Sequence, residues 1–589
     1  MKKMLSILLV LTLILGLLAG CGGSTAPAAM SESTQTASAS EAEPAPEQEA
    51  QEPAEPEAED APEAKTESIA EGSQVEPVEE PTEAEPVVYE LPLTDTPTTF
   101  TTFTSSPPGF IAAYLGPNGS YNEAECTRYF AEQTGVTIHF DEVDMFSFSE
   151  NFNLMIASGD YPDFVGMGGY AGGLTKALDD DVIIDLTDYV NGYMPAFSQR
   201  LDEAGLWKEV LNDEGQILSI PSINSEDFVD RGPVVRGDWL EQLGMDEPET
   251  FDDMYVLGKA ALNQFDIGYA YFFNSQLTPS ITFSAGFDLP VMDISAVGYH
   301  LYQQDGEVKS ALVDENLKDY LKLLQQWYQD GLLSKDFFNA VGMEVKSAFA
   351  GDACFGCWDN ADFITEDNRD AELAAKGFHA IGVPVPVREE GQTLHFNLGM
   401  NGLVQGGVSI TTACADPELL VNVFDYSFTD EGALISNYGM EGVSFEFDSE
   451  GKPQWTEAMT TATDRTFRAA IMPYIFSGLP TVVDMTRYWS ETFDEDAYHA
   501  LDLWTGADTD KSRDLPTALY YTTDEATVFS TKITDVETYA NEFMLTAITS
   551  GTDLDAEWDG FVKTIWSLGL QDCLDAEQGA YDRYLTRGE

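Results

Sequence analysis

The chain has 589 residues, of which 103 are Asp or Glu and only 28 are Lys or Arg, so its formal net charge is −75. A field of this sign repels nucleic acid and anionic lipid headgroups, and we therefore expect no nucleic-acid partner. Beyond its low-complexity N-terminal region the chain has about 490 residues, more than one hydrophobic core usually serves, so we expect at least two lobes.

The first 20 residues have the three-part layout of a secretory signal. Lys2 and Lys3 form a positive start, residues 4–18 are almost wholly apolar, and small residues precede Cys21. The apolar run spans roughly 22 Å as a helix, too short for a hydrocarbon core of about 30 Å. The tetrapeptide "LAGC" at 18–21 resembles a bacterial lipobox, so we expect a lipoprotein signal peptide at 1–20 and a lipidated Cys21. The alternative is an ordinary signal peptide with a chance cysteine.

Residues 21–95 differ in composition from the rest of the chain. The stretch "EAEPAPEQEAQEPAEPEAEDAPEA" contains no aromatic residue and no aliphatic residue larger than alanine. Such a segment cannot bury enough surface to offset the entropy of ordering the chain, and like charges and proline extend it. We predict a disordered acidic tether that holds a folded body, residues 96–589, away from the membrane.

From residue 97 the pattern alternates between strand and helix. This β-α-β-α-β order predicts a mainly parallel, doubly wound sheet, since parallel strands need helical crossovers. An amphipathic helix from Leu317 should bury Leu321, Leu324 and Trp327, and Trp558 and Trp566 also have core spacing. The first predicted elements are a strand at 100–104, a helix capped by Ser120 and ending near Gly135, a strand at 136–140, a helix capped by Ser147 and a strand at 164–167.

Ligands of open parallel sheets bind beyond the carboxyl ends of the strands. Three predicted strand ends carry polar or aromatic residues that suit a binding cleft. These are Gly168-Gly169-Tyr170, Ser222-Ile223-Asn224 and Trp358-Asp359-Asn360.

The usual catalytic and metal-binding motifs are missing from the sequence. There is no GxSxG nucleophile elbow and no Walker A loop, and the five histidines form no HExxH or other metal spacing. Cys354 and Cys357 have redox-motif spacing, but small buried residues or a local bridge are the favoured interpretation, because one CxxC without a second pair is weak evidence for zinc. We expect no cofactor, no metal and no catalytic residues.

Several segments, in their order along the chain, resemble the solute-binding lipoproteins of bacterial ABC importers. They include "FNLMIASGDYPDFV", "DEGQILSIP", "VVRGDWLEQLGMDEPETFDDM", "NYGMEGVSFEFDSEGKPQWTE" and "DLDAEWDGFVKTIWSLGLQDCLDAEQGAYDRYL". The likeness is to family-1, carbohydrate-type proteins, and among these to the long LipO-like lipoproteins. It implies a two-lobed α/β fold of the periplasmic-binding-protein-like type II, each lobe a mainly parallel sheet flanked by helices. Hinge crossings would join lobe 1 (about 97–233 and 404–440) to lobe 2 (about 234–403 and 441–589) and let the lobes close on a ligand.

A sugar offers apolar C–H faces to aromatic rings and hydroxyls to Asp, Asn, Arg and backbone groups. We predict that Trp358 is a stacking platform with Asp359 and Asn360 as hydroxyl partners. The alternative for each aromatic residue is core packing or an ordinary surface position, and Arg236 and Asp238 can equally pair with each other. The further predicted ligand residues are Tyr170, Ser222, Asn224, Arg236, Asp238, Tyr488, Trp489 and Trp504.

The resemblance implies a monomeric binding protein, not an enzyme, that captures a neutral sugar or oligosaccharide for the permease subunits of an ABC transporter. Its lipid anchor would hold it on the extracellular face of the cell membrane. Three alternatives remain open at this point: a binding protein for a peptide or other small solute, a cell-surface glycosidase that uses two carboxylates, and a sensor or adhesin without a transporter.

Overall fold

The structure is a computed structural model of the whole chain. It describes residues 87–107, 109–225, 229–273, 281–290, 300–338, 342–396, 398, 403–461, 467–476, 478–484, 487 and 494–587. The predicted signal peptide, Cys21 and all but the end of the predicted tether lie outside these residues. Within the described part of the chain, no helix combines the length and the apolar character that a membrane span requires.

The first lobe is built on a six-stranded sheet. Its strands alternate as half-buried strands should: in β2, Val136, Ile138 and Phe140 face the core while the residues between them are exposed. The strands follow the order β14 (Val482–Val483), β4 (Ile220–Asn224), β11 (Leu403–Ile410), β3 (Phe164–Gly166), β1 (Thr98–Ser105) and β2 (Val136–Val143).

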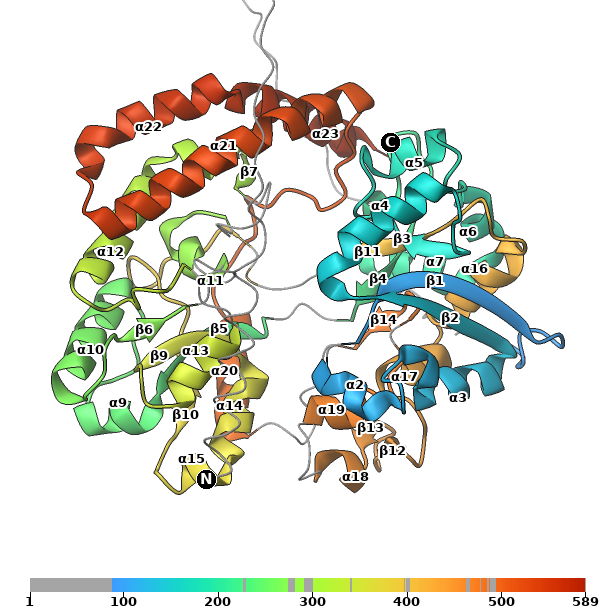
Figure 1. Cartoon of the computed structure of the whole chain (residues 1–589), viewed down its shortest axis with the longest axis horizontal. Coiled ribbons are helices and arrows are strands. Elements are labelled where there is room, and N and C mark those ends of the chain that lie inside the picture. The colour runs from blue at the N-terminus through green and yellow to red at the C-terminus, as the bar shows by residue number, and fades with distance from the viewer. Residues whose placement is uncertain are drawn as a thin grey trace, which may run out of the picture. The chain divides into compact units, whose positions relative to one another are not determined.

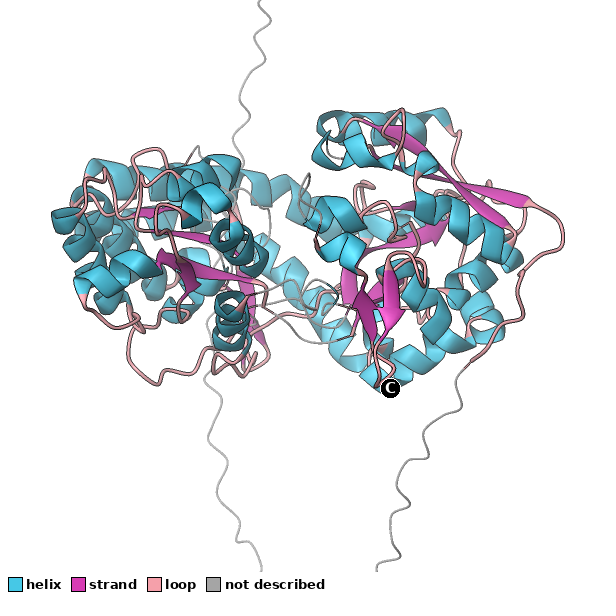
Figure 2. Cartoon of the chain, turned by 90° about the horizontal axis from the view of Figure 1, so that it is seen from below, coloured by secondary structure: helices cyan, strands magenta, loops and turns pink. Residues whose placement is uncertain are grey.

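Helices flank this sheet, with strands inside and helices outside (Figure 2). Gly135 ends α3 in the left-handed conformation, as predicted, but Ser120 caps a short 3-10 turn before α3 and not α3 itself. The helices are α2 (Gly109–Leu115), α3 (Glu125–Thr134), α4 (Phe148–Ser158), α5 (Gly173–Asp179), α6 (Thr187–Tyr193), α7 (Pro195–Ala204), α8 (Trp207–Val210), α16 (Pro417–Tyr426), α17 (Asp430–Asn437), α18 (Glu457–Thr460) and α19 (Phe467–Ile471). A hairpin of β12 (Phe445–Phe447) and β13 (Pro453–Trp455) adjoins α18.

The second lobe is built on a four-stranded sheet in the order β10 (Ala380–Gly382), β5 (Arg231–Arg236), β9 (Gly356–Asn360) and β6 (Tyr271–Phe272). As predicted, Leu321, Leu324 and Trp327 of α12 are buried in its core. Its helices are α9 (Gly237–Leu243), α10 (Phe251–Gln264), α11 (Ile281–Ser284), α12 (Glu315–Gln329), α13 (Gly342–Ala350), α14 (Ala361–Arg369), α15 (Ala371–Ala374), α20 (Glu495–Thr505), α21 (Thr523–Ser550), α22 (Leu554–Leu568) and α23 (Leu570–Thr586), with a hairpin of β7 (Leu301–Gln304) and β8 (Glu307–Ser310).

The three C-terminal helices belong to the second lobe. α21 packs against α12, α22 and α23, and residues of all three join the core that contains β5 and β6. Figure 1 shows α21 and α22 side by side, with α23 running on toward α5 of the first lobe. Trp558 is buried in this helical layer as predicted, whereas Trp566 is 37% exposed, so its predicted core position is wrong.

Both sheets are mainly parallel, as predicted, but in each described sheet one strand runs against its neighbours. β11 is antiparallel to both β3 and β4, and β5 is antiparallel to both β9 and β10. β5 follows directly on β4 of the other lobe, and β11 likewise enters after a long run through the second lobe. A strand that enters from the other lobe crosses its new sheet in the opposite direction to strands that begin within that lobe.

The boundary between lobes also differs from the predicted one after residue 440. β14 pairs in parallel with β4 of the first sheet, and Phe476 and Leu479 lie in the first lobe's core. The described residues between 441 and 483 therefore join the first lobe, and α20 again belongs to the second lobe. β5 places the earlier crossing slightly before 233, since Arg231 already pairs with Asn360 of β9.

Candidate functional site

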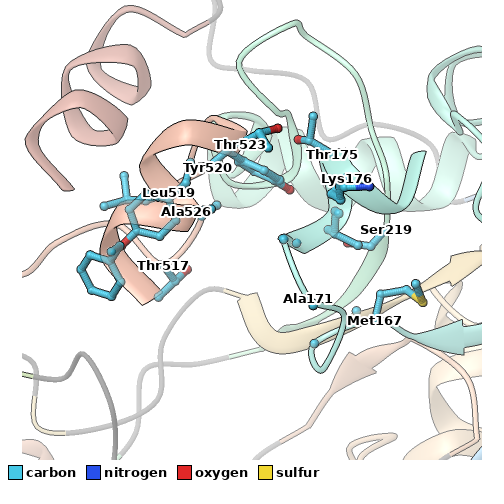
Figure 3. A pocket seen from close by; sticks show the side chains of 18 of the residues that line it. Met167, Ala171, Thr175, Lys176, Ser219, Thr517, Leu519, Tyr520, Thr523 and Ala526 are labelled. Atoms are coloured by element: carbon cyan, nitrogen blue, oxygen red, sulfur yellow. The ribbon is translucent and has the colours of Figure 1, made fainter. Parts of the chain in front are cut away.

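A cavity of about 870 Å³ lies between the carboxyl end of β3 in the first lobe and the segment that leads into α21 in the second (Figure 3). Its size falls within the range of about 300–1,000 Å³ that is typical of small-molecule sites. It is lined by Met167, Gly168, Ala171, Gly172, Gly173, Leu174, Thr175, Lys176, Glu209, Val210, Ser219, Pro221, Gly407, Thr517, Ala518, Leu519, Tyr520, Tyr521, Thr523, Ala526, Thr527, Phe529 and Ser530.

The first-lobe wall depends on glycines. After β3 the chain turns through Gly172 and Gly173, which both have positive φ (93° and 75°), into the first turn of α5. A Cβ on Gly172 would come within 2.9 Å of the Lys176 side chain. At Gly407, where β11 shifts register against β4, a Cβ would lie 2.7 Å from the Pro221 nitrogen. Glycine at these positions keeps the wall open and lets backbone approach backbone.

The second-lobe wall consists of residues 517–521 and the first turns of α21. Thr522 and Glu525 form a capping box that starts α21, so the wall ends in a rigid helix. Figure 3 shows Leu519, Tyr520 and Thr523 on the side of the cavity opposite Met167, Thr175, Lys176 and Ser219. Burial raises the pKa of the Tyr520 phenol, which therefore stays protonated and can donate a hydrogen bond.

The lining combines hydroxyls with apolar surface, and its two charged residues already have partners. Lys176 pairs with Asp180, and Glu209 accepts hydrogen bonds from the hydroxyls of Tyr584 and Thr517 (3.3 Å to Thr517). The side-chain hydroxyls of Thr175, Ser219 and Thr523 make no hydrogen bond to another residue of the described segments. A site of this kind suits an uncharged ligand that carries both hydroxyls and apolar faces.

Ser222 and Asn224 lie just beyond the cavity, on β4 after Pro221. The Ser222 hydroxyl accepts a hydrogen bond from the Thr481 N–H (3.1 Å), so it supports the start of β14. Asn224 is only 8% exposed, and neither its Nδ2 nor its Oδ1 has a partner among the described residues. A buried amide without partners is costly, which makes Asn224 a suitable hydrogen-bonding group for a ligand.

Tyr170 lies next to the cavity lining, but its hydroxyl is directed elsewhere. It donates to Asp180 (2.7 Å), the carboxylate that also holds Lys176. Burial and the nearby Asp180 raise the pKa of Tyr170 to about 12, while hydrogen bonds from Lys176 and Tyr170 lower that of Asp180. Tyr170 thus supports α5, and its neighbours Gly168 and Ala171 reach the cavity.

Trp358 lies in the second lobe's core and is only 2% exposed. Its ring packs edge-on against Phe273 and Phe283, and its indole Nε1 has no partner in the described part of the chain. Asp359 accepts a hydrogen bond from the Asn360 N–H (2.9 Å), and the Asn360 side chain accepts one from Arg231 Nε (2.7 Å). None of the three lines the 870 Å³ cavity.

Arg236, Asp238 and Trp504 have structural contacts of their own. Arg236 pairs with Asp238 (2.7 Å) and Asp352, and its guanidinium stacks on Trp239 and Phe378. Trp504 is fully buried, and its Nε1 donates to the Val383 carbonyl (2.9 Å). These residues therefore stabilise the second lobe, and their predicted ligand contacts have no support in the geometry.

The remaining candidates lie partly outside the described residues. Tyr488 and Trp489 are among those not described. Cys354 and Cys357 are free and buried, which fits the favoured interpretation of small core residues, and burial raises the pKa of both thiols. Among the residues that the structure describes, no three His, Cys, Asp or Glu side chains gather as a metal site would require.

Sequence reasoning missed the whole second-lobe wall at 517–530. Its only local signal is "YYTTDE", in which two tyrosines directly precede the Thr522–Glu525 capping box. Of the residues that the strand-end rule selected in the first lobe, Gly168 lines the cavity, whereas Tyr170, Ser222 and Asn224 are outside its lining.

Comparison with known proteins gives two curated relatives. The fructooligosaccharide ABC transporter substrate-binding protein FusA of Streptococcus pneumoniae serotype 4 is 25% identical over 499 residues, which cover 79% of this chain and 87% of that protein. Lipoprotein LipO of Bacillus subtilis is 24% identical over 231 residues, covering 38% and 45% of the two chains. No family model matches the chain. The predicted resemblance to solute-binding lipoproteins of ABC importers is thus confirmed.

Solved structures share the fold. The alginate-binding protein AlgQ2 without calcium ion has a TM-score of 0.65 at 22% identity, with 83% of this chain and 99% of that chain covered. FusA of S. pneumoniae in complex with kestose gives the same TM-score, identity and coverage. The predicted two-lobed, type II periplasmic-binding-protein-like fold is confirmed, apart from the direction of the two crossing strands.

Proposed function

We propose that this chain is an extracellular solute-binding protein that captures a neutral sugar or oligosaccharide in the cavity between its lobes and delivers it to an ABC permease. The observation that carries this proposal is the 870 Å³ cavity, whose charges are paired internally and whose lining offers hydroxyls and two tyrosines. It lies at the carboxyl edge of β3, in a fold shared with proteins whose names record sugar ligands.

The ligand contacts that we propose differ in part from those predicted from sequence. Tyr520 provides an aromatic face, Thr175, Ser219 and Thr523 provide hydroxyls, and Asn224 provides a buried amide. Micromolar affinity needs about −8 kcal/mol, which one stacked ring and several buried hydrogen bonds can supply.

The remaining parts of the proposal rest on the sequence and on LipO. Cys21 carries the lipid that anchors the protein outside the cell, and the body acts as a monomer. The tether is shorter than the predicted 21–95, because Tyr89 donates a hydrogen bond to Asp425 (2.7 Å) and Leu91 and Leu93 pack against the core of the first lobe. The protein binds its ligand without altering it, in keeping with relatives that are substrate-binding proteins. If new reducing ends appeared when the purified body was incubated with glycans, the glycosidase alternative would replace this proposal.

The test is calorimetric titration of the purified body with kestose and a panel of other neutral oligosaccharides. We expect one of them to bind at micromolar concentration, and Tyr520→Ala to weaken that binding by about 1–3 kcal/mol, as hot-spot aromatics do. Tyr193→Ala is the matched control, because Tyr193 is an exposed tyrosine on α6, away from the cavity. Failure of every sugar to bind, together with binding of a peptide, would overturn the proposal.

A further inference from the structure

Two arginines in the last turn of α23 and just beyond it converge on one carboxylate of the other lobe. Arg583 Nε lies 2.6 Å from Asp213 Oδ2, and Arg587 Nη2 lies 2.7 Å from Asp213 Oδ1. Asp213 lies between α8 and β4, in the first lobe, and the Arg587 side chain is only 1% exposed. Removal of one partner from an ion pair as buried as Arg587–Asp213 costs far more than removal from a pair on the surface.

The same two arginines hold the second-lobe wall of the cavity. Arg583 Nη2 donates to the Tyr520 carbonyl (2.8 Å), and Arg587 Nη1 donates to the carbonyls of Ala518 and Lys208 (both 2.9 Å). The Arg587 guanidinium also lies 5.2 Å from the centre of the Tyr520 ring, within cation–π range. Neither arginine lines the cavity, yet together they contact the backbone and ring of a residue that does.

Other contacts of this C-terminal turn also bridge the two lobes. α23 is fixed in the second lobe by Leu570, Leu574 and Tyr581, which lie in its core. From the same helix the Tyr584 hydroxyl donates to Glu209, and the Leu585 carbonyl accepts from Lys208 Nζ (3.1 Å). The turn thus connects the second lobe to α8 of the first lobe directly beside the cavity.

The charge composition makes this arrangement unusual for the chain. With 28 basic residues against 103 acidic ones, cations are scarce. Two of them, Arg583 and Arg587, lie about one helical turn apart at the C-terminal end of α23. Arg583 also pairs with Glu525 of the α21 capping box (2.5 Å). Glu525 and Asp213 raise the pKa of Arg583 above its usual value, so Arg583 stays charged at any physiological pH.

We propose that Arg583, Arg587 and Asp213 form a C-terminal clasp that positions Tyr520 in the cavity wall and thereby sets the affinity for ligand. The geometric part stands by itself, while the effect on affinity rests on the proposed function. The clasp predicts that ligand binding depends on the last turn of a helix whose residues do not touch the ligand.

The experiment compares Arg587→Gln, Arg587→Lys, Asp213→Asn and the double variant Arg587→Gln/Asp213→Asn with the wild-type body. Arg128→Gln is the matched control, because Arg128 lies on α3 with a 60% exposed side chain paired to Glu125. The rate of amide hydrogen exchange in peptides covering 515–522 measures how firmly the clasp holds this segment, and it needs no ligand. We expect about tenfold faster exchange there in Arg587→Gln and Asp213→Asn, with unchanged exchange in peptides from the remainder of the chain.

The double variant should show no more than the larger of the two single effects, because both substitutions remove the same contact. Arg587→Lys should give an intermediate effect, since a lysine keeps the charge but cannot bond Asp213 and two carbonyls together. Unchanged exchange at 515–522, or faster exchange spread evenly over the chain with a lower melting temperature, would overturn the clasp.

Titration with kestose and the same neutral oligosaccharide panel then tests the effect on affinity. We expect about tenfold weaker binding in Arg587→Gln and wild-type binding in Arg128→Gln. Wild-type affinity in Arg587→Gln would refute the positioning role and leave the proposed function intact. Changed exchange with no sugar bound by any variant would instead confirm the clasp and refute the proposed function.

Discussion

Asp359 provides a direct test of the electrostatics of the second lobe. Its carboxylate lies near the end of β9, where it accepts a hydrogen bond from the N–H of Asn360 (2.9 Å). Burial raises its pKa to about 7 from an ordinary 3.8; the nearby Lys346 acts in the opposite direction, and Asp362 and Asp367 in the same one. Replacement by asparagine keeps the shape of the side chain and removes its ionisation.

Proton linkage determines whether ionisation of Asp359 raises or lowers the free energy of unfolding. Between pH 3.8 and 7 the folded protein holds the Asp359 proton and the unfolded chain has lost it, so the free energy of unfolding falls as the pH rises through this window. Each pKa unit corresponds to about 1.4 kcal/mol, so the loss amounts to at most about 4 kcal/mol by pH 8. Partial exposure of the residue lets water screen some of this penalty and reduces the figure.

The assay is urea unfolding of wild-type protein and Asp359→Asn between pH 4.5 and 8, followed by tryptophan fluorescence. We expect Asp359→Asn to gain stability relative to wild type as the pH rises, by a few kcal/mol between pH 4.5 and 8. Asp141→Asn is the control, because Asp141 is an exposed carboxylate on β2 of the first lobe. Parallel pH profiles for wild type and Asp359→Asn would refute a buried, protonated Asp359.

Two further predictions follow from burial and from the N-terminal sequence. Trp358→Ala should lower the free energy of unfolding by about 3–5 kcal/mol, as large-to-small core substitutions do, and an unchanged unfolding midpoint would show that Trp358 is not a core residue. Cys21→Ser should abolish incorporation of labelled palmitate and release the protein from the cell surface, since the lipid is its proposed anchor; continued membrane retention would point to an ordinary signal peptide or another anchor.

Sequence patterns predicted those features of the helices and strands that depend on residues close together in the chain. The alternation at 136–140, the glycine that ends α3 and the spacing of Leu321, Leu324 and Trp327 all depend on residues close in sequence. The directions of β5 and β11 depend instead on the lobe from which the chain enters the sheet. The sequence of a single strand contains no information about that direction. Trp566 has the same helical spacing as Trp558 but faces outward, because the layer formed by α21, α22 and α23 buries only one side of α22.

For a related reason, the sequence pointed to part of the first-lobe wall of the candidate site and to none of the second-lobe wall. The strand-end rule uses topology that the sequence reveals, and it selected the loop after β3, of which Gly168 lines the cavity. It also selected Ser222 and Asn224, which lie within β4 and outside the lining. The second wall comes from residues about 350 positions later, where the docking of α23 onto the first lobe brings Tyr520 beside Lys176 and Ser219. Nothing near Tyr520 in sequence indicates Asp213 as the residue that fixes this docking.

The positions of Trp358 and Trp504 show why an aromatic residue cannot be assigned to a ligand site from its sequence neighbours alone. A large aromatic ring next to polar residues is equally suited to stacking on a sugar and to filling a core, because both bury the same apolar surface. Trp358 and Trp504 fill the core of the second lobe, and Gly232 and Gly382 leave room for the Trp504 ring. Tyr520, Tyr521 and Phe529 are the aromatic residues that line the cavity. The Tyr521 hydroxyl bonds Glu577 and Phe529 packs against the second-lobe core, whereas Tyr520 is held in place by guanidinium groups. In this chain, therefore, the ring best placed to meet a ligand is the one whose position depends on contacts between the two lobes.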